Sequence, residues 1–135
     1  MVTVTRKAHF SAAHRLHNPA WSDQRNAEVF GKCNNPNGHG HNYVIEVTVG
    51  GEPAPETGMV IDLKKLAAII DEEIIEAVDH KHFNVDVDFM RGVVPTAENI
   101  ALAFWRILEP KIHEGRLVSV KLFESDQNFV EYRGE

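Results

Sequence analysis

The stretch from His39 to Val49 constrains the fold more than any other part of the sequence, because apolar side chains recur there at every second position. The residues of this apolar parity are Tyr43, Ile45, Val47 and Val49. Alternation with a period of two is typical of a β-strand with one buried face. His39 and His41 share the same parity. The pattern therefore predicts two imidazoles on the buried face, at the start of a strand.

Further elements are predicted on both sides of this strand. Period-two patterns predict strands over Val2 to about His14, Leu117 to Glu124 and Phe129 to Arg133. Apolar stripes with helical spacing predict one helix from Asp62 to about His80 and another from Thr96 to about Pro110. Residues 17–38 are rich in Asn, Pro and Gly, which favours a long loop. The order β-β-α-α-β-β predicts an α+β fold with helices on one face of a sheet, and we expect oligomerisation to cover the other face.

The composition is that of an ordinary globular protein, with 43% apolar and 25% charged residues. Its 135 residues predict one domain over residues 1–135. No stretch is apolar enough to cross a membrane, and the first residues lack a secretory hydrophobic region, so we expect a cytosolic protein. A net charge of −6 argues against nucleic acid as the main partner but leaves room for a small phosphorylated substrate. Eight histidines are the first hint of metal or proton chemistry.

His14 ends the first predicted strand, just before the long loop. If the first two strands pair as an antiparallel hairpin, His14 lies next to His39 and His41. Three imidazoles with one open position are the catalytic pattern for zinc, whereas a structural zinc site has four protein ligands. Zinc is favoured over iron or copper because neutral imidazole suits it and no carboxylate facial triad is evident. The alternative is that each histidine is an ordinary core or loop residue.

Cys33 is the only cysteine, which excludes an internal disulfide. A free cysteine is more often an inert small hydrophobic residue, but the loop Gly31–Gly38 is too polar to bury it as core. The neighbouring Lys32 and a nearby metal would favour its thiolate form, which suits an acid–base group. Alternatively, Cys33 is the fourth ligand of a closed structural zinc site, and the sequence leaves both hypotheses open.

Several carboxylates are candidates for further roles. Asp79 precedes His80 at a helix end, and an Asp that orients a His is a recurrent acid–base pair, although a His beside a helix C-terminus is also common. Glu124 shares the parity of the apolar residues in its strand, and its two acceptor oxygens suit a ligand with adjacent N–H donors. Glu98 could act similarly, but a Glu in a first helical turn ordinarily complements the helix dipole, and this interpretation is favoured.

These residues together resemble the 6-pyruvoyl tetrahydropterin synthase family over nearly the whole chain. The segments that carry the resemblance are Phe10–Leu16, Phe30–Tyr43, Val78–Lys81, Thr96–Asn99 and Glu131–Gly134. The run from Cys33 to His39-Gly-His41 is the most specific of them. The resemblance implies the tunnelling fold, in which four-stranded antiparallel sheets, each with two helices on one face, come from three subunits and close into a barrel. Two such trimers stack into a homohexamer.

The resemblance also implies an activity. The enzyme would be a zinc-dependent lyase of tetrahydrobiopterin biosynthesis that acts on 7,8-dihydroneopterin triphosphate. Its products would be 6-pyruvoyl tetrahydropterin and inorganic triphosphate, formed by internal redox transfer. His14, His39 and His41 would be the zinc ligands, and Cys33 would be the general base.

The remaining roles follow from the same resemblance. Asp79 and His80 would complete a proton relay that comes from a neighbouring subunit. Glu124 would anchor the pterin, assisted by Thr96 and Glu98.

Two alternatives remain. A sister branch makes 6-carboxy-tetrahydropterin in the deazaguanine (queuosine) pathway, and its members typically have a shorter spacing between the cysteine and His-Gly-His. The longer spacing from Cys33 to His39 favours the biopterin branch, while Ala97, where animal-type enzymes have Thr, leaves the lineage open. A non-catalytic zinc-binding assembly protein is the alternative from another class, and an intact Cys33, Asp79 and His80 argue against it.

Overall fold

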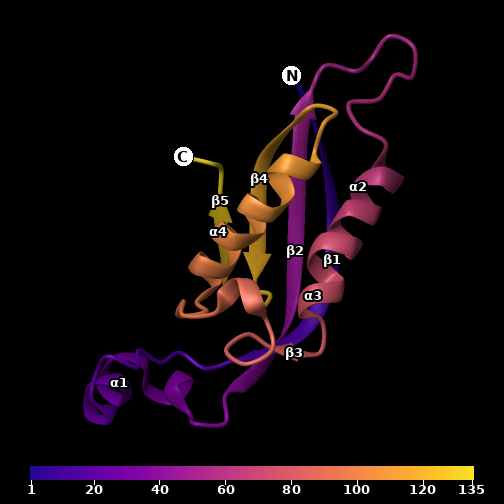
Figure 1. The fold of residues 1–135 in the computed structure, drawn as a ribbon. Coiled ribbons are helices and arrows are strands. Elements are labelled where there is room, and N and C mark those ends of the chain that lie inside the picture. The colour runs from indigo at the N-terminus through magenta and orange to yellow at the C-terminus, as the bar shows by residue number, and fades with distance from the viewer.

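The computed structural model describes residues 1–135 and contains one five-stranded sheet with helices on one face (Figure 1). Its strands are β1 (Val2–His14), β2 (His39–Gly51), β3 (Lys81–His82), β4 (Arg116–Phe123) and β5 (Phe129–Tyr132). Its α-helices are α1 (Asp23–Phe30), α2 (Leu63–Ile70), α3 (Glu76–Val78) and α4 (Ala97–Leu108). A π-helical turn, Asp71–Ile75, joins α2 to α3, and short 3₁₀ turns cover Gly31–Asn34, Asp88–Met90 and Glu109–Lys111. The strand order is β3-β1-β2-β4-β5.

The β1–β2 hairpin is the longest pairing in the sheet. The two strands run antiparallel from Val2 opposite Gly51 to His14 opposite His39. The predicted hairpin is therefore confirmed: β1 ends at His14, and β2 begins at His39. Since successive side chains of a strand alternate between faces, this register places His14, His39 and His41 on the face that carries the core.

The core lies between the helices and that face of the sheet. Asp62 caps α2 by accepting a hydrogen bond from the Lys64 amide, and Thr96 caps α4 by accepting one from the Asn99 amide, as the sequence predicted. The fully buried helix side chains are Leu66, Ile70, Ile74, Val78, Ile100, Phe104 and Leu108, and those of the sheet are Tyr43, Ile45, Val47, Val49, Val120 and Leu122. Each buried Leu or Ile contributes about 1.5–3 kcal/mol through removal of apolar surface from water.

The predicted four-stranded antiparallel sheet is wrong in one respect. A fifth strand, β3, pairs parallel to β1, with Ala12 opposite Lys81 and Ala13 opposite His82. A strand of two residues carries no alternating pattern, so the sequence could not reveal it. It follows Asp79 and His80 directly, and it therefore ties the candidate acid–base pair to the end of β1.

The predicted loop over residues 17–38 is also wrong in part, because it contains the helix α1. Ser22 caps this helix by accepting a hydrogen bond from the Arg25 amide. Only Asn26 of α1 is buried, so the helix has no apolar stripe from which it could be predicted. Figure 1 shows α1 beyond the end of the β1–β2 hairpin, away from α2 and α4.

The opposite face of the sheet is not covered by any helix (Figure 1). It carries a hydrogen bond between the hydroxyls of Thr5 and Thr48 and an ion pair between Lys7 and Glu46. No helix of the structure combines the length and the apolar character that a membrane span requires. The uncovered face and the edge strands β3 and β5 are candidate surfaces for association with other chains.

Candidate metal centre

Three imidazoles converge at the end of the β1–β2 hairpin. The Nε2 atom of His14 lies 3.1 Å from that of His39 and 3.2 Å from that of His41. The three candidate ligand atoms all lie within 4.8 Å of one another. The proximity predicted from the hairpin is confirmed, and the cluster is a candidate metal site.

His14 is held in one tautomer. Its Nδ1 lies 2.7 Å from the carbonyl oxygen of Pro95, and a carbonyl can only accept, so Nδ1 carries the proton and donates it. The hydroxyl of Tyr43 also lies 3.3 Å from this nitrogen. Nε2 of His14 therefore presents a lone pair to His39 and His41. Imidazole ligands of metals are commonly oriented by such a second hydrogen bond.

The environment also keeps His14 neutral. Its side chain is only 1% exposed, and burial, reinforced by the neighbouring imidazoles, lowers its pKa to about 4. Burial likewise lowers the pKa of His41. Neutral imidazole is the form that binds metal, so these two side chains are in the binding form at pH 7.

The arrangement fits a metal ion better than a hydrogen-bonded cluster. His14 offers one lone pair, and two other imidazoles approach it at the same time. Nδ1 of His39 is buried without a hydrogen-bond partner. Three nitrogens at zinc–nitrogen distances of about 2.0–2.1 Å in a tetrahedral site would lie about 3.4 Å apart. This is close to the 3.1 and 3.2 Å that separate Nε2 of His14 from Nε2 of His39 and of His41. The donor set, three neutral imidazoles, is one that zinc accepts.

Glu124 lies beside the three imidazoles, just beyond the end of β4. Its Oε2 is 3.8 Å from Nε2 of His14 and 3.9 Å from Nε2 of His41. Its backbone amide donates to the carbonyl of Asn128, which fixes the turn that carries it. Burial raises the pKa of Tyr43, and the nearby Glu124 carboxylate adds to that effect. Glu124 is thus a partly exposed anion at the mouth of the candidate metal site.

Cys33 sits in the 3₁₀ turn Gly31–Asn34 and is half-buried. Its carbonyl accepts a hydrogen bond of 2.9 Å from the amide of Leu16, which ties the turn to the chain just after His14. Its thiol is not among the ligand atoms that lie close to one another. The structure therefore does not assemble a four-ligand site that includes Cys33, and the acid–base role of Cys33 stays a prediction.

The chain reverses sharply at Asp79 and His80. His80 is the only residue other than glycine with a positive φ, 61°, and such a conformation is held only when its surroundings determine it. Nδ1 of His80 lies 2.9 Å from Oδ2 of Asp79. Ser11 anchors both residues, because its amide donates to Asp79 Oδ1 and its carbonyl accepts from the His80 amide. The hydrogen bond from Ser11 lowers the pKa of Asp79, so this carboxylate stays ionised beside the imidazole.

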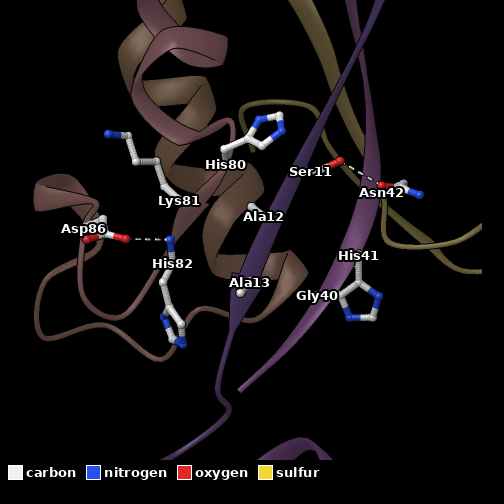
Figure 2. Close-up of a pocket in the computed structure, with 10 residues that line it drawn as sticks. All are labelled: Ser11, Ala12, Ala13, Gly40, His41, Asn42, His80, Lys81, His82 and Asp86. Carbon is white, nitrogen blue, oxygen red and sulfur yellow. Dashed lines mark hydrogen bonds between the residues drawn. The ribbon is translucent and has the colours of Figure 1, made fainter. Parts of the chain in front are cut away.

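His80 and His41 line the same hollow, shown in Figure 2. Its volume is about 470 Å³, within the range of small-molecule sites. The structure thus brings His80, which is paired with Asp79, and one candidate metal ligand to the lining of one hollow within a single chain.

Thr96 and Glu98 do not line this hollow. The Thr96 hydroxyl is used in capping α4. Glu98 is exposed in the first turn of α4 and lines a separate groove with Glu131 and Tyr132 of β5. This position agrees with the helix-dipole interpretation, and a contact of either residue with a pterin stays a prediction.

The fold and the three-imidazole cluster can be set beside known proteins. A family model described as "6-pyruvoyl tetrahydropterin synthase" matches residues 3–135. The chain belongs to this family.

Individual members of the synthase family agree with this assignment. The 6-pyruvoyl tetrahydrobiopterin synthase of Homo sapiens is 48% identical over 132 residues, covering 98% of this chain and 91% of the human protein. The structure of the Caenorhabditis elegans 6-pyruvoyl tetrahydropterin synthase superposes with a TM-score of 0.94 at 43% identity, covering 99% of this chain and 96% of that one. The 6-carboxy-5,6,7,8-tetrahydropterin synthase of Rickettsia typhi is 32% identical over 150 residues, covering 97% and 99%. The similarity is therefore greater to the biopterin-type synthases.

Sequence reasoning missed the groups that orient the candidate site of this synthase-family chain. The Pro95 carbonyl that fixes the tautomer of His14 is 81 positions away from it in sequence. The Ser11 backbone contacts both Asp79 and His80. Any residue type except proline could make these main-chain hydrogen bonds, so the sequence does not indicate them. For the contact between Tyr43 and His14, the sequence offered one signal: Tyr43 has the same strand parity as His39 and His41 and therefore lies on the same face.

Proposed function

We propose that the chain is a 6-pyruvoyl tetrahydropterin synthase that converts 7,8-dihydroneopterin triphosphate into 6-pyruvoyl tetrahydropterin and inorganic triphosphate. The observation that carries this proposal is the convergence of His14, His39 and His41 in a chain that matches the family over residues 3–135. The reaction oxidises the side chain of the pterin while the ring is reduced, so no external oxidant is needed.

In this proposal the three imidazoles hold zinc. A zinc ion bound there would supply a Lewis acid for the hydroxyl oxygens of the substrate side chain, which acidifies the adjacent C–H group. Cys33 accepts the proton from that carbon as a thiolate. His80 returns a proton to the substrate, and Asp79 holds its Nδ1–H so that Nε2 is free for exchange. In the proposed assembly, the Asp79–His80 pair serves the site of a neighbouring subunit.

Glu124 would accept hydrogen bonds from adjacent N–H groups on the edge of the pterin ring. Its position beside the imidazoles supports this role, because the ring must lie next to the metal for the side-chain hydroxyls to reach it. We extend the same proposal to Thr96 and Glu98, which would assist Glu124 in holding the pterin.

Product analysis with 7,8-dihydroneopterin triphosphate tests the proposed function. The purified protein is expected to release inorganic triphosphate and a pterin with a three-carbon pyruvoyl side chain. The sister activity, supported by the Rickettsia typhi similarity, would give a one-carbon carboxyl group at the same position. A chain that binds metal and releases neither product would be an assembly protein and not an enzyme.

Glu124→Gln is expected to lower kcat/KM by an amount that corresponds to about 2–5 kcal/mol, the range for breaking a buried charge-assisted pair. The glutamine keeps the shape of the side chain but loses the anion that pairs with the pterin edge. Metal content should stay that of the wild type, because Glu124 is not one of the three converging ligands. Wild-type efficiency in the variant would make Glu124 an ordinary strand-end carboxylate.

The proposed assembly is a hexamer of two stacked trimers. Its support is the uncovered sheet face and the edge strand β5, which has only four residues and carries Phe129 half-exposed. We expect light scattering at micromolar concentration to give a mass near six times 15.2 kDa. A monomeric mass would contradict both the hexamer and any site shared between subunits.

A further inference from the structure

A second cavity lies beside the candidate metal centre and differs from it in charge. It has a volume of about 520 Å³ and lies between the segment that follows β1 and residues 84–94. The side chains with N–H donors that line it include Arg15, His17 and His82, and no carboxylate lines it. The chain as a whole has a net charge of −6, so a cavity lined by an arginine and by no acidic side chain differs in charge from the rest of the molecule.

This cavity adjoins the metal centre through the backbone. Arg15 directly follows His14, and the cavity wall at Val94 leads into Pro95, whose carbonyl holds the imidazole of His14. Gly38 packs closely against His82, which lines the cavity. The φ of Gly38 is +77°, and a Cβ there would lie 2.7 Å from His82 Nε2. A Cβ at this position would also lie 3.0 Å from the carbonyl oxygen of His14, so the close approach of these segments requires glycine.

Arg15 is held in place by hydrogen bonds to neutral groups, and it forms no ion pair with a carboxylate. The Asn84 side chain accepts from the Arg15 amide at 2.8 Å and donates to the Arg15 carbonyl at 2.9 Å. Nε of Arg15 donates to the carbonyl of Asn34 at 3.0 Å. The side-chain cations that form ion pairs with carboxylates are Lys7, Lys65, Arg91, Lys111 and Arg133, and Arg15 is not among them. Its terminal guanidinium N–H groups are therefore free for an anion, which they can bind in a bidentate manner.

Both histidines of the cavity also present donors. Nδ1 of His17 accepts from the Asn34 amide group at 2.9 Å, and Nδ1 of His82 accepts from the Asn84 backbone amide at 3.2 Å. A neutral imidazole that accepts at Nδ1 carries its proton on Nε2. Figure 2 shows the side chains of His82 and Lys81 pointing in different directions, and His82 lines both this cavity and the hollow that contains His41. Two imidazole N–H groups thus join the guanidinium as hydrogen-bond donors.

We propose that this cavity binds the triphosphate group of the substrate, with Arg15 as its main contact and with His17 and His82 as additional donors. The proposal rests on the proposed function for the identity of the ligand, while the donor set on its own favours a group with anionic oxygens. Its place next to the three imidazoles lets one molecule put its hydroxyls at the metal and its phosphates in the cavity. Arg15 is then a binding residue for the leaving group.

The rival site is the hollow of Figure 2, which contains Lys81. Asp86 also lines that hollow, and its carboxylate accepts from the His82 amide at 3.0 Å. An anion there would meet a like charge as well as the lysine. Lys81 is exposed and has no ion-pair partner, so it provides a matched control for the loss of one positive charge.

Calorimetric titration with inorganic triphosphate tests the proposal on the purified, metal-containing protein. Arg15→Gln is expected to bind inorganic triphosphate about ten- to hundredfold more weakly than the wild type, the loss of one or two charge-assisted hydrogen bonds. Lys81→Gln should stay within about twofold of the wild type. The metal content and melting temperature of each variant are measured alongside. If Arg15→Gln melts below the wild type, His17→Gln takes its place, with an expected loss of about three- to tenfold.

A second titration uses 7,8-dihydroneopterin, which lacks the phosphates, and Arg15→Gln should bind it as tightly as the wild type does. An equal loss for both ligands would overturn the proposal, as would unchanged triphosphate affinity in Arg15→Gln or a larger loss in Lys81→Gln. These results are separate from the test of the proposed function. A protein that binds triphosphate through Arg15 but forms no pyruvoyl product would keep the anion site and lose the enzymatic assignment.

Discussion

His14→Ala is expected to remove the bound metal and abolish turnover. His14 is the central imidazole of the cluster, because its Nε2 lies within 3.2 Å of both other imidazoles, and its Nδ1 is fixed by Pro95. Without it, two imidazoles remain, and the three-ligand set of a catalytic zinc site is incomplete. The affinity for metal should fall by more than about 10–100-fold, the cost of losing an outer-shell partner, because a ligand itself is lost.

The same change should also destabilise the metal-free protein. The Pro95 carbonyl would lose its donor in a buried place, which costs about 1–3 kcal/mol. Elemental analysis, a thermal melt and the product assay measure the three effects. His113→Ala is the matched control, since His113 is exposed and lies outside the cluster. Wild-type metal content in His14→Ala, or an equal loss in His113→Ala, would show that the three imidazoles do not form the metal site.

Cys33→Ala is expected to lower turnover by about 10²–10⁴, the usual contribution of a general base. The metal content should not change, because the thiol is not among the converging ligand atoms. The turn around Cys33 should also persist, because its link to β1 runs through the backbone carbonyl of Cys33 and the amide of Leu16. The variant therefore separates an acid–base role from a ligand role.

The measurements for Cys33→Ala are single-turnover kinetics, metal content and mass by light scattering. Cys33→Ser serves as a second variant, because a hydroxyl keeps the size of the side chain but is a far weaker base than a thiolate at neutral pH. Loss of metal and of folded protein in Cys33→Ala would instead support the closed structural site. Full activity in both variants would assign the proton transfer to another group.

Much of the fold could be predicted because its main elements are patterned. The period of two along β2 fixed the buried face, and the apolar stripe of Leu66, Ile70 and Ile74 fixed the long helix. The helix α1 could not be predicted, since its single buried residue is Asn26 and its stability depends on capping and local contacts. The strand β3 could not be predicted either, because two residues give no period.

The candidate site likewise has a part that the sequence predicts and a part that it does not. His14, His39 and His41 were found because a hairpin register follows from two adjacent strands. The hydrogen bond from His14 to Pro95 and the anchoring of Asp79 by Ser11 depend on how distant segments pack, and one sequence does not contain that information. Arg15 was not singled out because a cation becomes informative only when its neighbours are known to lack a carboxylate.

The strand β1 holds two reactive groups at a fixed separation. Ser11 anchors the Asp79–His80 pair through its backbone, and His14, three residues further along the same strand, belongs to the imidazole cluster. An extended strand rises about 3.3 Å per residue, so the two anchoring points lie about 10 Å apart. Deleting one residue between them would shorten this spacing by a third and turn His14 to the opposite face. The segment between Ser11 and His14 should therefore tolerate substitutions, but neither an insertion nor a deletion.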